Sequence, residues 1–272
     1  MKACNRRYIE WGVTGVGALA LFLFFFKLLP YHLFHREQTQ LFLYASEALT
    51  EYLKHPAALA GLLGDFLTQF FYYEGGGPAI MTVVLLLWGM VVFRLLLPYI
   101  GRWAWLPAVA AVVWEAGRQC GLLYPLSGTI ALIGIGSLVL LCRSCFRRSW
   151  KLGLPVGVLA VVAGYWLFGY GNWSSGWYNT PDLERERLLA LDSETYFGRM
   201  EKVRKLLAEQ DLHAPFATYY YNLLHARQMQ LPDKLTDYYQ PASQGLFLPV
   251  APTSTYLTIY AANEVWFALG DM

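Results

Sequence analysis

Charged residues are scarce in this sequence, and they are unevenly distributed. Asp, Glu, Lys and Arg make up 15% of the 272 residues, whereas a soluble domain has about 25%. Residues 1–180 carry 13 Lys or Arg and 7 Asp or Glu, and residues 181–272 carry 8 and 12. The first part is too apolar for an ordinary soluble core, and the second has the composition of a globular segment. The net charge of +2 and the lack of a dense basic face argue against a nucleic-acid partner.

Cysteine is scarce as well, with four residues in the chain. The pair Cys142-x-x-Cys145 has the spacing of a redox or zinc motif, but no second pair accompanies it. We interpret it as two small residues at a helix end. The spacing His32-x-x-His35-x-Glu37 does not suit three ligands on one helical face. We therefore predict no metal site and no cofactor.

Long apolar runs are abundant, and five are suited to crossing a lipid bilayer. They lie near residues 9–29, 78–100, 103–116, 126–142 and 152–170. The first run has a basic start but no small-residue cleavage site before Lys27, so we expect an uncleaved signal anchor. The fold class predicted is all-α: a polytopic membrane helical bundle of about five spans, residues 1–180, followed by a helical soluble segment.

Basic residues predict the orientation of these spans. With five spans, nine of the 13 basic residues of this part fall on one side of the membrane. These are Lys2, Arg6, Arg7, Arg94, Arg102, Arg143, Arg147, Arg148 and Lys151. We expect a bacterial inner (plasma) membrane protein with a cytoplasmic N-terminus and a periplasmic segment 181–272.

The connection between the first two spans is the longest one, and it predicts two interfacial helices, near residues 41–54 and 57–73. One interpretation is that they form the wall of a site at the mouth of the bundle. Such a site would hold His32, His35, Glu37 and Asp65. The alternative is that the two helices plug the bundle and the polar residues face water.

Residues 181–272 have helical periodicity, with short turns between the predicted helices. This pattern predicts α-hairpins of the tetratricopeptide kind, with a plain helical bundle as the alternative. The concave face of such a helical-hairpin solenoid would bind another envelope protein or peptide through aromatic side chains, namely Tyr219, Tyr220, Tyr221 and Tyr256. The last predicted helix lacks a second helix to cover it, so we expect a longer protein.

Two segments carry a family resemblance: the run from His35 to Leu43 and the run from Leu62 to Tyr73. With the signal anchor before them, they resemble an uncharacterised family of multi-pass bacterial inner-membrane proteins with an exported helical-repeat tail. The chain departs from the family pattern at Arg36 and at the run from Glu74 to Gly77. The resemblance implies a location and an architecture, and no activity.

A fainter resemblance is to membrane glycosyltransferases that use lipid-linked sugars. Those enzymes also have a long first outer loop with a catalytic acid just after the first span. The resemblance implies Glu37 as catalytic base, with Asp65 second. It implies that His32, Arg36 or Arg118 neutralises the lipid phosphate.

A transporter is disfavoured because the spans hold few charges and no matching pair of broken helices. The leading prediction is a membrane-anchored scaffold with a helical binding module. The sequence leaves open whether the protein is an enzyme.

Overall fold

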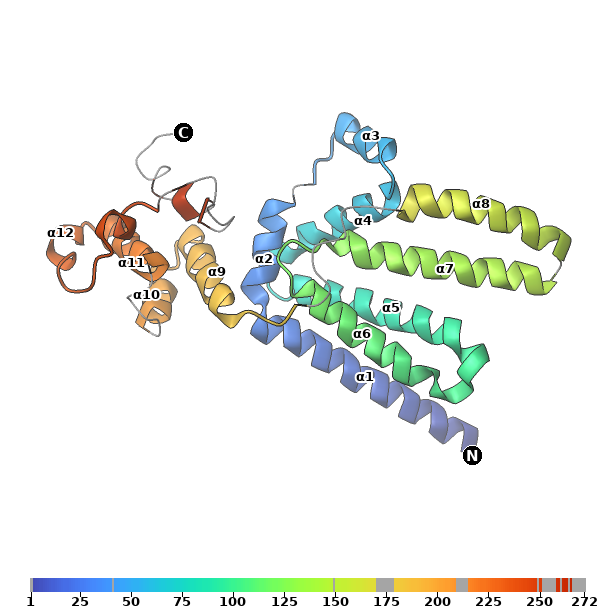
Figure 1. Ribbon diagram of the computed structural model, residues 1–272. Helices are drawn as coiled ribbons and strands as arrows, with labels where there is room; N and C mark the ends of the chain where they lie inside the picture. Colours follow the sequence, from blue (N-terminus) through green and yellow to red (C-terminus); the bar gives the residue numbers. More distant parts are fainter. Residues whose placement is uncertain are drawn as a thin grey trace. The chain divides into compact units, whose positions relative to one another are not determined.

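The structure, a computed structural model, consists of helices joined by turns and loops, and no strand occurs in the part of the chain that it describes (Figure 1). The all-α prediction is therefore confirmed. The residues described are 2–40, 42–148, 150–169, 179–208, 215–248, 250, 258–259, 261–263 and 265. The chain divides into two compact units, Met1–Asp182 and Leu183–Met272.

The first unit begins with two helices at a sharp angle to each other. α1 (Lys2–Leu28) ends just before Pro30, which is the first residue of α2 (Pro30–Thr39). Proline suits a first helical position because its missing N–H needs no partner there, and its ring does not fit inside a continuous helix. The two axes differ by 76°. α2, a helix that the sequence analysis did not predict, therefore lies across the end of α1 (Figure 1).

The next segment differs in part from the predicted interfacial helices. α3 (Ser46–Lys54) starts five residues later than predicted for the 41–54 helix, and residues 42–45 have no helical structure. Packing over a longer range accounts for this, because the Phe42 ring contacts the Phe66 ring, with centroids 5.6 Å apart. The second predicted helix is present as α4 (Ala58–Thr68) and the short helix η1 (Gln69–Tyr72).

Four longer helices complete this unit, in two pairs of adjacent helices (Figure 1). They are α5 (Gly76–Ile100), α6 (Trp105–Gln119), α7 (Leu126–Arg148) and α8 (Trp150–Phe168). The turn between α5 and α6 begins at Gly101, whose φ of 57° lies in the left-handed region that favours glycine, and continues through η2 (Gly101–Ala104). α4 packs closely on α7: a Cβ added at Gly64 would lie 2.7 Å from the backbone nitrogen of Ser127.

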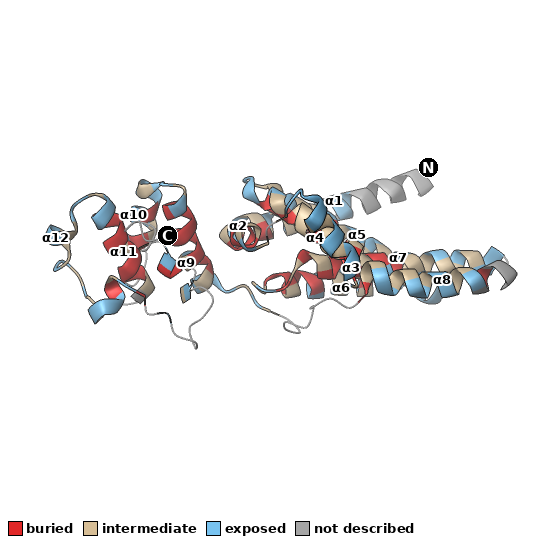
Figure 2. Ribbon diagram, turned by 90° about the horizontal axis from the view of Figure 1, so that it is seen from above, coloured by how far each residue is buried: buried red, intermediate tan, exposed pale blue. Residues whose placement is uncertain are grey.

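Burial in this unit is concentrated at one end. The buried apolar cluster brings together Phe25 of α1, Leu33 of α2, Ala60 of α4, Met81 of α5 and Leu126 of α7. Large parts of α7 and α8 are instead exposed or only partly buried (Figure 2). The exposed residues of α8 are mostly apolar: Val158, Leu159, Val161, Val162, Tyr165 and Trp166.

Among the described residues, two helical stretches are long and apolar enough to cross a membrane, Gly76–Gln119 and Leu126–Arg148. A third is added if the bent pair of Thr14–Leu28 and Pro30–Thr39 is taken as one span. The apolar helix Pro155–Phe168 is shorter.

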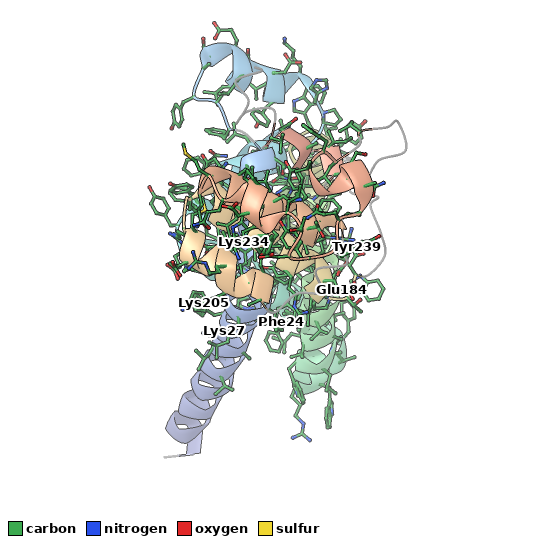
Figure 3. All side chains as sticks on the ribbon, turned by 90° about the vertical axis from the view of Figure 1, so that its left-hand side faces the viewer. Phe24, Lys27, Glu184, Lys205, Lys234 and Tyr239 are labelled. Carbon is green, nitrogen blue, oxygen red and sulfur yellow. The ribbon has the colours of Figure 1, made fainter. Side chains whose placement is uncertain are left out.

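The second unit has its own apolar core, formed by α9, α10 and α11 (Figure 2). Its helical elements are α9 (Leu183–Tyr196), α10 (Met200–Ala208), α11 (Pro215–Arg227), α12 (Leu231–Lys234) and η3 (Ala242–Gly245). Acidic residues occupy the first turn of α9, where the helix dipole favours them. Many of its exposed residues are charged, among them Glu184 and Lys205, which are labelled in Figure 3.

Candidate functional site

A chain of buried polar side chains connects α2, α6 and α7 at the densely packed end of the first unit. Arg36 Nη1 donates to Gln119 Oε1 at 2.7 Å, and Gln119 Nε2 donates to Thr129 Oγ1 at 2.7 Å. Thr129 Oγ1 donates in turn to Glu115 Oε1 at 2.6 Å. All four residues are at most 1% exposed. The hydrogen bonds therefore run in one direction, from a guanidinium to a carboxylate.

Helical spacing places these groups on common faces. Glu115, Arg118 and Gln119 are three and four positions apart on α6, so they lie on one side of that helix. Thr129 lies one turn after the start of α7. Arg118 was predicted as a site residue from the sequence, whereas the other polar residues of α6 and α7 were not. The signal that was available is a run of Glu, Arg and Gln at helical spacing after an apolar stretch.

Glu115 is the acceptor on which several donors converge. Besides Thr129, Tyr124 donates its hydroxyl to Glu115 Oε1 at 2.8 Å. Arg118 Nη1 lies 3.2 Å from Glu115 Oε2, and its guanidinium lies over the Tyr124 ring, 4.2 Å from the centroid. Burial and the neighbouring Glu115 carboxylate raise the pKa of the Tyr124 hydroxyl, so this phenol is a hydrogen-bond donor at neutral pH. Arg118 balances the charge of Glu115.

Arg36 lacks such a balance. Its side chain is 0% exposed, and it forms no ion pair with any residue that the structure describes. Its Nε and Nη2 atoms have no hydrogen-bond partner in the part of the chain that the structure describes, and its guanidinium lies 5.9 Å from the centroid of the Phe71 ring. A buried donor without an acceptor costs about 1–3 kcal/mol, and more when the group is charged.

The histidines named from the sequence are close to Arg36 in the chain. His32 and His35 are 2% and 1% exposed, and they share α2 with Arg36. His32 precedes Arg36 by four positions, which places the two residues on the same face of the helix. Of the predicted phosphate-binding residues, Arg36 and Arg118 thus belong to one hydrogen-bonded network, and His32 lies on the same face of α2 as Arg36.

The two predicted catalytic acids occupy different surroundings. Glu37 is half-buried on α2 and has no hydrogen bond or ion pair with the residues that the structure describes. Asp65 on α4 accepts a 2.6 Å hydrogen bond from the Tyr52 hydroxyl of α3. Burial raises the pKa of Asp65, and the Tyr52 hydrogen bond partly opposes this effect. The structure therefore pairs Asp65 with α3, and not with the residues of α2.

An open cavity of about 530 Å³ lies between α3, α4 and the start of α7. Apolar residues form most of its lining, together with the polar side chains of Glu51, Tyr52, His55 and Ser127. None of the site residues predicted from the sequence lines it. No group of three or more His, Cys, Asp or Glu side chains suited to a metal ion occurs among the described residues.

The tyrosines named as partner-binding residues lie in or beside the core of the second unit. Tyr219 and Tyr220 are 1% exposed. Their hydroxyls donate to the Ala261 carbonyl at 2.8 Å and to Asp192 Oδ1 at 2.6 Å. Tyr221 is half-buried and packs its ring against Tyr238, whereas Tyr256 lies outside the described residues. Tyr219 and Tyr220 thus face the interior in this conformation.

Comparison with known proteins gives one family match. The model of a family of unknown function, DUF6057, matches residues 6–178 and 170–272, which together include nearly the whole chain. No curated protein and no solved structure matches it.

Proposed function

Because the chain belongs to the DUF6057 family of unknown function, its role has to be argued from its own residues, and we propose that it is a membrane-anchored scaffold. In this proposal the first unit inserts into the bacterial inner membrane. The second unit is a helical module outside the cytoplasm that binds another envelope protein or peptide. The observation that carries the proposal is the division into two compact units, of which the first has a largely apolar exterior and the second has many charged residues on its surface.

The apolar exterior of the first unit supports the membrane part. The exposed fractions of Leu159 and Val161 on α8 are 70% and 74%, and those of Val109 and Val113 on α6 are 53% and 55%. Large contiguous apolar surfaces are rare on soluble monomers, whereas lipid chains cover them in a membrane. We propose five spans, with α1, α5, α6, α7 and α8 as the spanning helices and the N-terminus in the cytoplasm.

The second unit supports a binding module. α9, α10 and α11 pack against one another as consecutive helices with a common core, which is how a helical-hairpin repeat begins. We therefore propose a tetratricopeptide-like segment. Exposed residues of this unit, such as Met229 at 92% and Tyr239 at 54% exposed, are better placed to meet a partner than Tyr219 and Tyr220.

Membrane topology can be tested with reporter fusions. Alkaline phosphatase, which is active only outside the cytoplasm, would be fused after Lys54, after Arg102, after Arg148 and after Arg227. We expect activity at the first and last positions and none at the two middle ones. Activity after Arg148 together with none after Arg227 would contradict the proposed orientation.

Partner binding can be tested with a photo-crosslinking amino acid in the full-length protein in its native host. We expect crosslinks to a protein or peptide from position Met229 or Tyr239. The matched control is the same amino acid at exposed Tyr99 of the first unit. Crosslinks to no protein from any exposed position of the second unit would contradict the scaffold.

A lipid-linked sugar transferase remains the second candidate. It is favoured by one observation: Glu37, without a partner among the described residues, directly follows the buried cation Arg36 in the chain, on the same helix α2. This candidate predicts that Glu37→Gln abolishes function at normal expression, whereas the exposed Glu47→Gln control has no effect. The scaffold predicts that both substitutions are harmless and that deleting residues 183–272 is not.

A further inference from the structure

From the surroundings of Arg36 we infer that the buried edge of its guanidinium binds an oxyanion of the phosphate type, with a lipid head group as its source. The site consists of Arg36, held in place by Gln119, with His32 on the same face of α2. The oxyanion site does not depend on the scaffold proposal. Only the lipid source depends on the membrane assignment.

The hydrogen bonds of the Arg36 guanidinium show which of its donors are available to a ligand. Gln119 Oε1 accepts from Nη1 at 2.7 Å, whereas Nε and Nη2 have no hydrogen-bond partner among the described residues. In a guanidinium, the N–H groups of Nε and Nη2 point the same way. They form the fork that binds two oxygens of a phosphate or carboxylate. The network thus holds one end of the guanidinium and leaves its bidentate edge without an acceptor among the described residues.

The net charge of the buried network also favours an anionic ligand. The buried network contains two cations, Arg36 and Arg118, and one anion, Glu115, so with neutral histidines it has an excess of one positive charge. Glu115 is paired with Arg118 and is separated from Arg36 by Gln119 and Thr129. Buried charges in proteins are normally paired, so a single bound anion would balance the excess positive charge at Arg36.

The place of Arg36 in the first unit favours a lipid head group as the source of the anion. Arg36 lies on α2, which packs where the buried apolar cluster joins the end of α1, the end of α6 and the starts of α5 and α7. If these helices span the bilayer, that end lies at the depth of the lipid phosphates. α2, which departs from the α1 axis by 76°, would run along the membrane surface. Basic pockets between spanning helices at this depth can bind anionic lipid head groups.

Binding requires a small movement, because Arg36 is fully covered. The chain permits this on the C-terminal side of α2. Residues 42–45 have no helical structure, and Leu43 and Tyr44 are 54% and 85% exposed. A shift of α2 relative to η1, which contributes Phe71 above the guanidinium, would open the unpaired edge.

The test uses the purified full-length protein, delipidated in a neutral detergent. Its Tm is measured with short-chain phosphatidic acid, with the matched diacylglycerol that lacks the phosphate, and with inorganic phosphate at constant ionic strength. We expect phosphatidic acid to raise the Tm in a concentration-dependent way and diacylglycerol not to. If inorganic phosphate raises the Tm equally, the oxyanion site stands and its lipid source is wrong. If neither phosphate compound raises it, the site is wrong.

Variants separate a binding role from a structural one. Each variant's ligand-induced shift is compared with its own ligand-free Tm. Arg36→Met should weaken binding about thirtyfold or more, and Arg36→Lys, which keeps the charge but not the fork, should weaken it as well. The control is Arg94→Met, at an exposed arginine of the same unit.

A purely structural Arg36 would give a different result: a lower ligand-free Tm with an unchanged shift. That result in either Arg36 variant would overturn the inference. If Arg36→Met does not fold, Arg36→Lys and the wild-type measurements still decide the question.

Discussion

Arg36 and Gln119 lie 83 positions apart in the sequence and are joined by a hydrogen bond of 2.7 Å between buried atoms. This contact fastens the loop helix α2 to the end of α6. Because Gln119 also donates to Thr129, it connects the Arg36 guanidinium to the Glu115 carboxylate. Substitutions in this series of hydrogen bonds should therefore change the stability of the whole densely packed end of the first unit.

Glu115→Gln should destabilise the first unit. The amide keeps an acceptor for Tyr124 and Thr129, but it leaves the largely buried Arg118 without its counter-charge. Removing one partner of a buried ion pair costs about 3–5 kcal/mol. Thermal unfolding of the purified protein in detergent measures the effect. The control is Glu51→Gln, which breaks an exposed pair with Lys54 and should leave the Tm unchanged. Equal Tm values for both variants would contradict this prediction.

Gly64→Ala should weaken the packing of α4 on α7. The new Cβ would lie 2.7 Å from the backbone nitrogen of Ser127, and backbone cannot rotate away as a side chain can. Overpacking of this kind costs about 1–3 kcal/mol. Gly61→Ala is the control on the same helix, because its Cβ would lie 3.4 Å from the Tyr52 ring, an ordinary contact. Thermal unfolding should show a loss for residue 64 alone, because Ala inside a helix is otherwise favoured over Gly. A loss at residue 61 as large as that at residue 64 would contradict the prediction.

Asp65 should give the protein a pH-dependent stability. Burial raises its pKa in the folded state above the ordinary value of 3.8, so the folded chain holds the proton more tightly than the unfolded chain. The free energy of unfolding should therefore fall as pH rises from the ordinary pKa through the folded one. Asp65→Asn, which stays neutral, should lack this fall and be the more stable protein at neutral pH. Tm measured against pH for both proteins tests it, and parallel curves would refute the prediction.

Tyr220→Phe should destabilise the second unit. The substitution removes a 2.6 Å hydrogen bond to Asp192, whose side chain is 6% exposed. The loss of a donor to a buried carboxylate costs about 1–3 kcal/mol. Hydrogen exchange of α9 and α11 in the full-length protein measures the loss directly. Tyr196→Phe, at a tyrosine that is 61% exposed, is the control and should leave exchange rates unchanged.

Much of the fold was predictable because it is encoded locally. The five long apolar runs coincide for most of their length with α1, α5, α6, α7 and α8, and α2 begins at Pro30. α2 itself was missed because its ten residues are mostly polar and carry no strong apolar periodicity. The predicted start of α3 was wrong because the Phe42 ring packs against residues further along the chain.

Less of the candidate site was predictable. His32, Arg36 and Arg118 were identified as polar residues near apolar runs, but their partners Gln119, Thr129 and Glu115 were not. A hydrogen-bond partner depends on how helices pack, and no single stretch of sequence contains that information. The same limit applies to Tyr219 and Tyr220, because an aromatic residue on a helix suits a binding face and a core equally well.

The sequence by itself determined the long apolar helices and the contrast between an apolar first part and a more polar second part. Both follow from hydropathy, periodicity and proline, which act over a few neighbouring residues. Only the tertiary structure decided which charges are balanced. Glu115 meets Arg118 one turn away, whereas Arg36 is joined to an amide 83 positions distant and remains an uncompensated buried cation. The physical reason is that the energy of a buried charge depends on what the packing of distant helices brings to it.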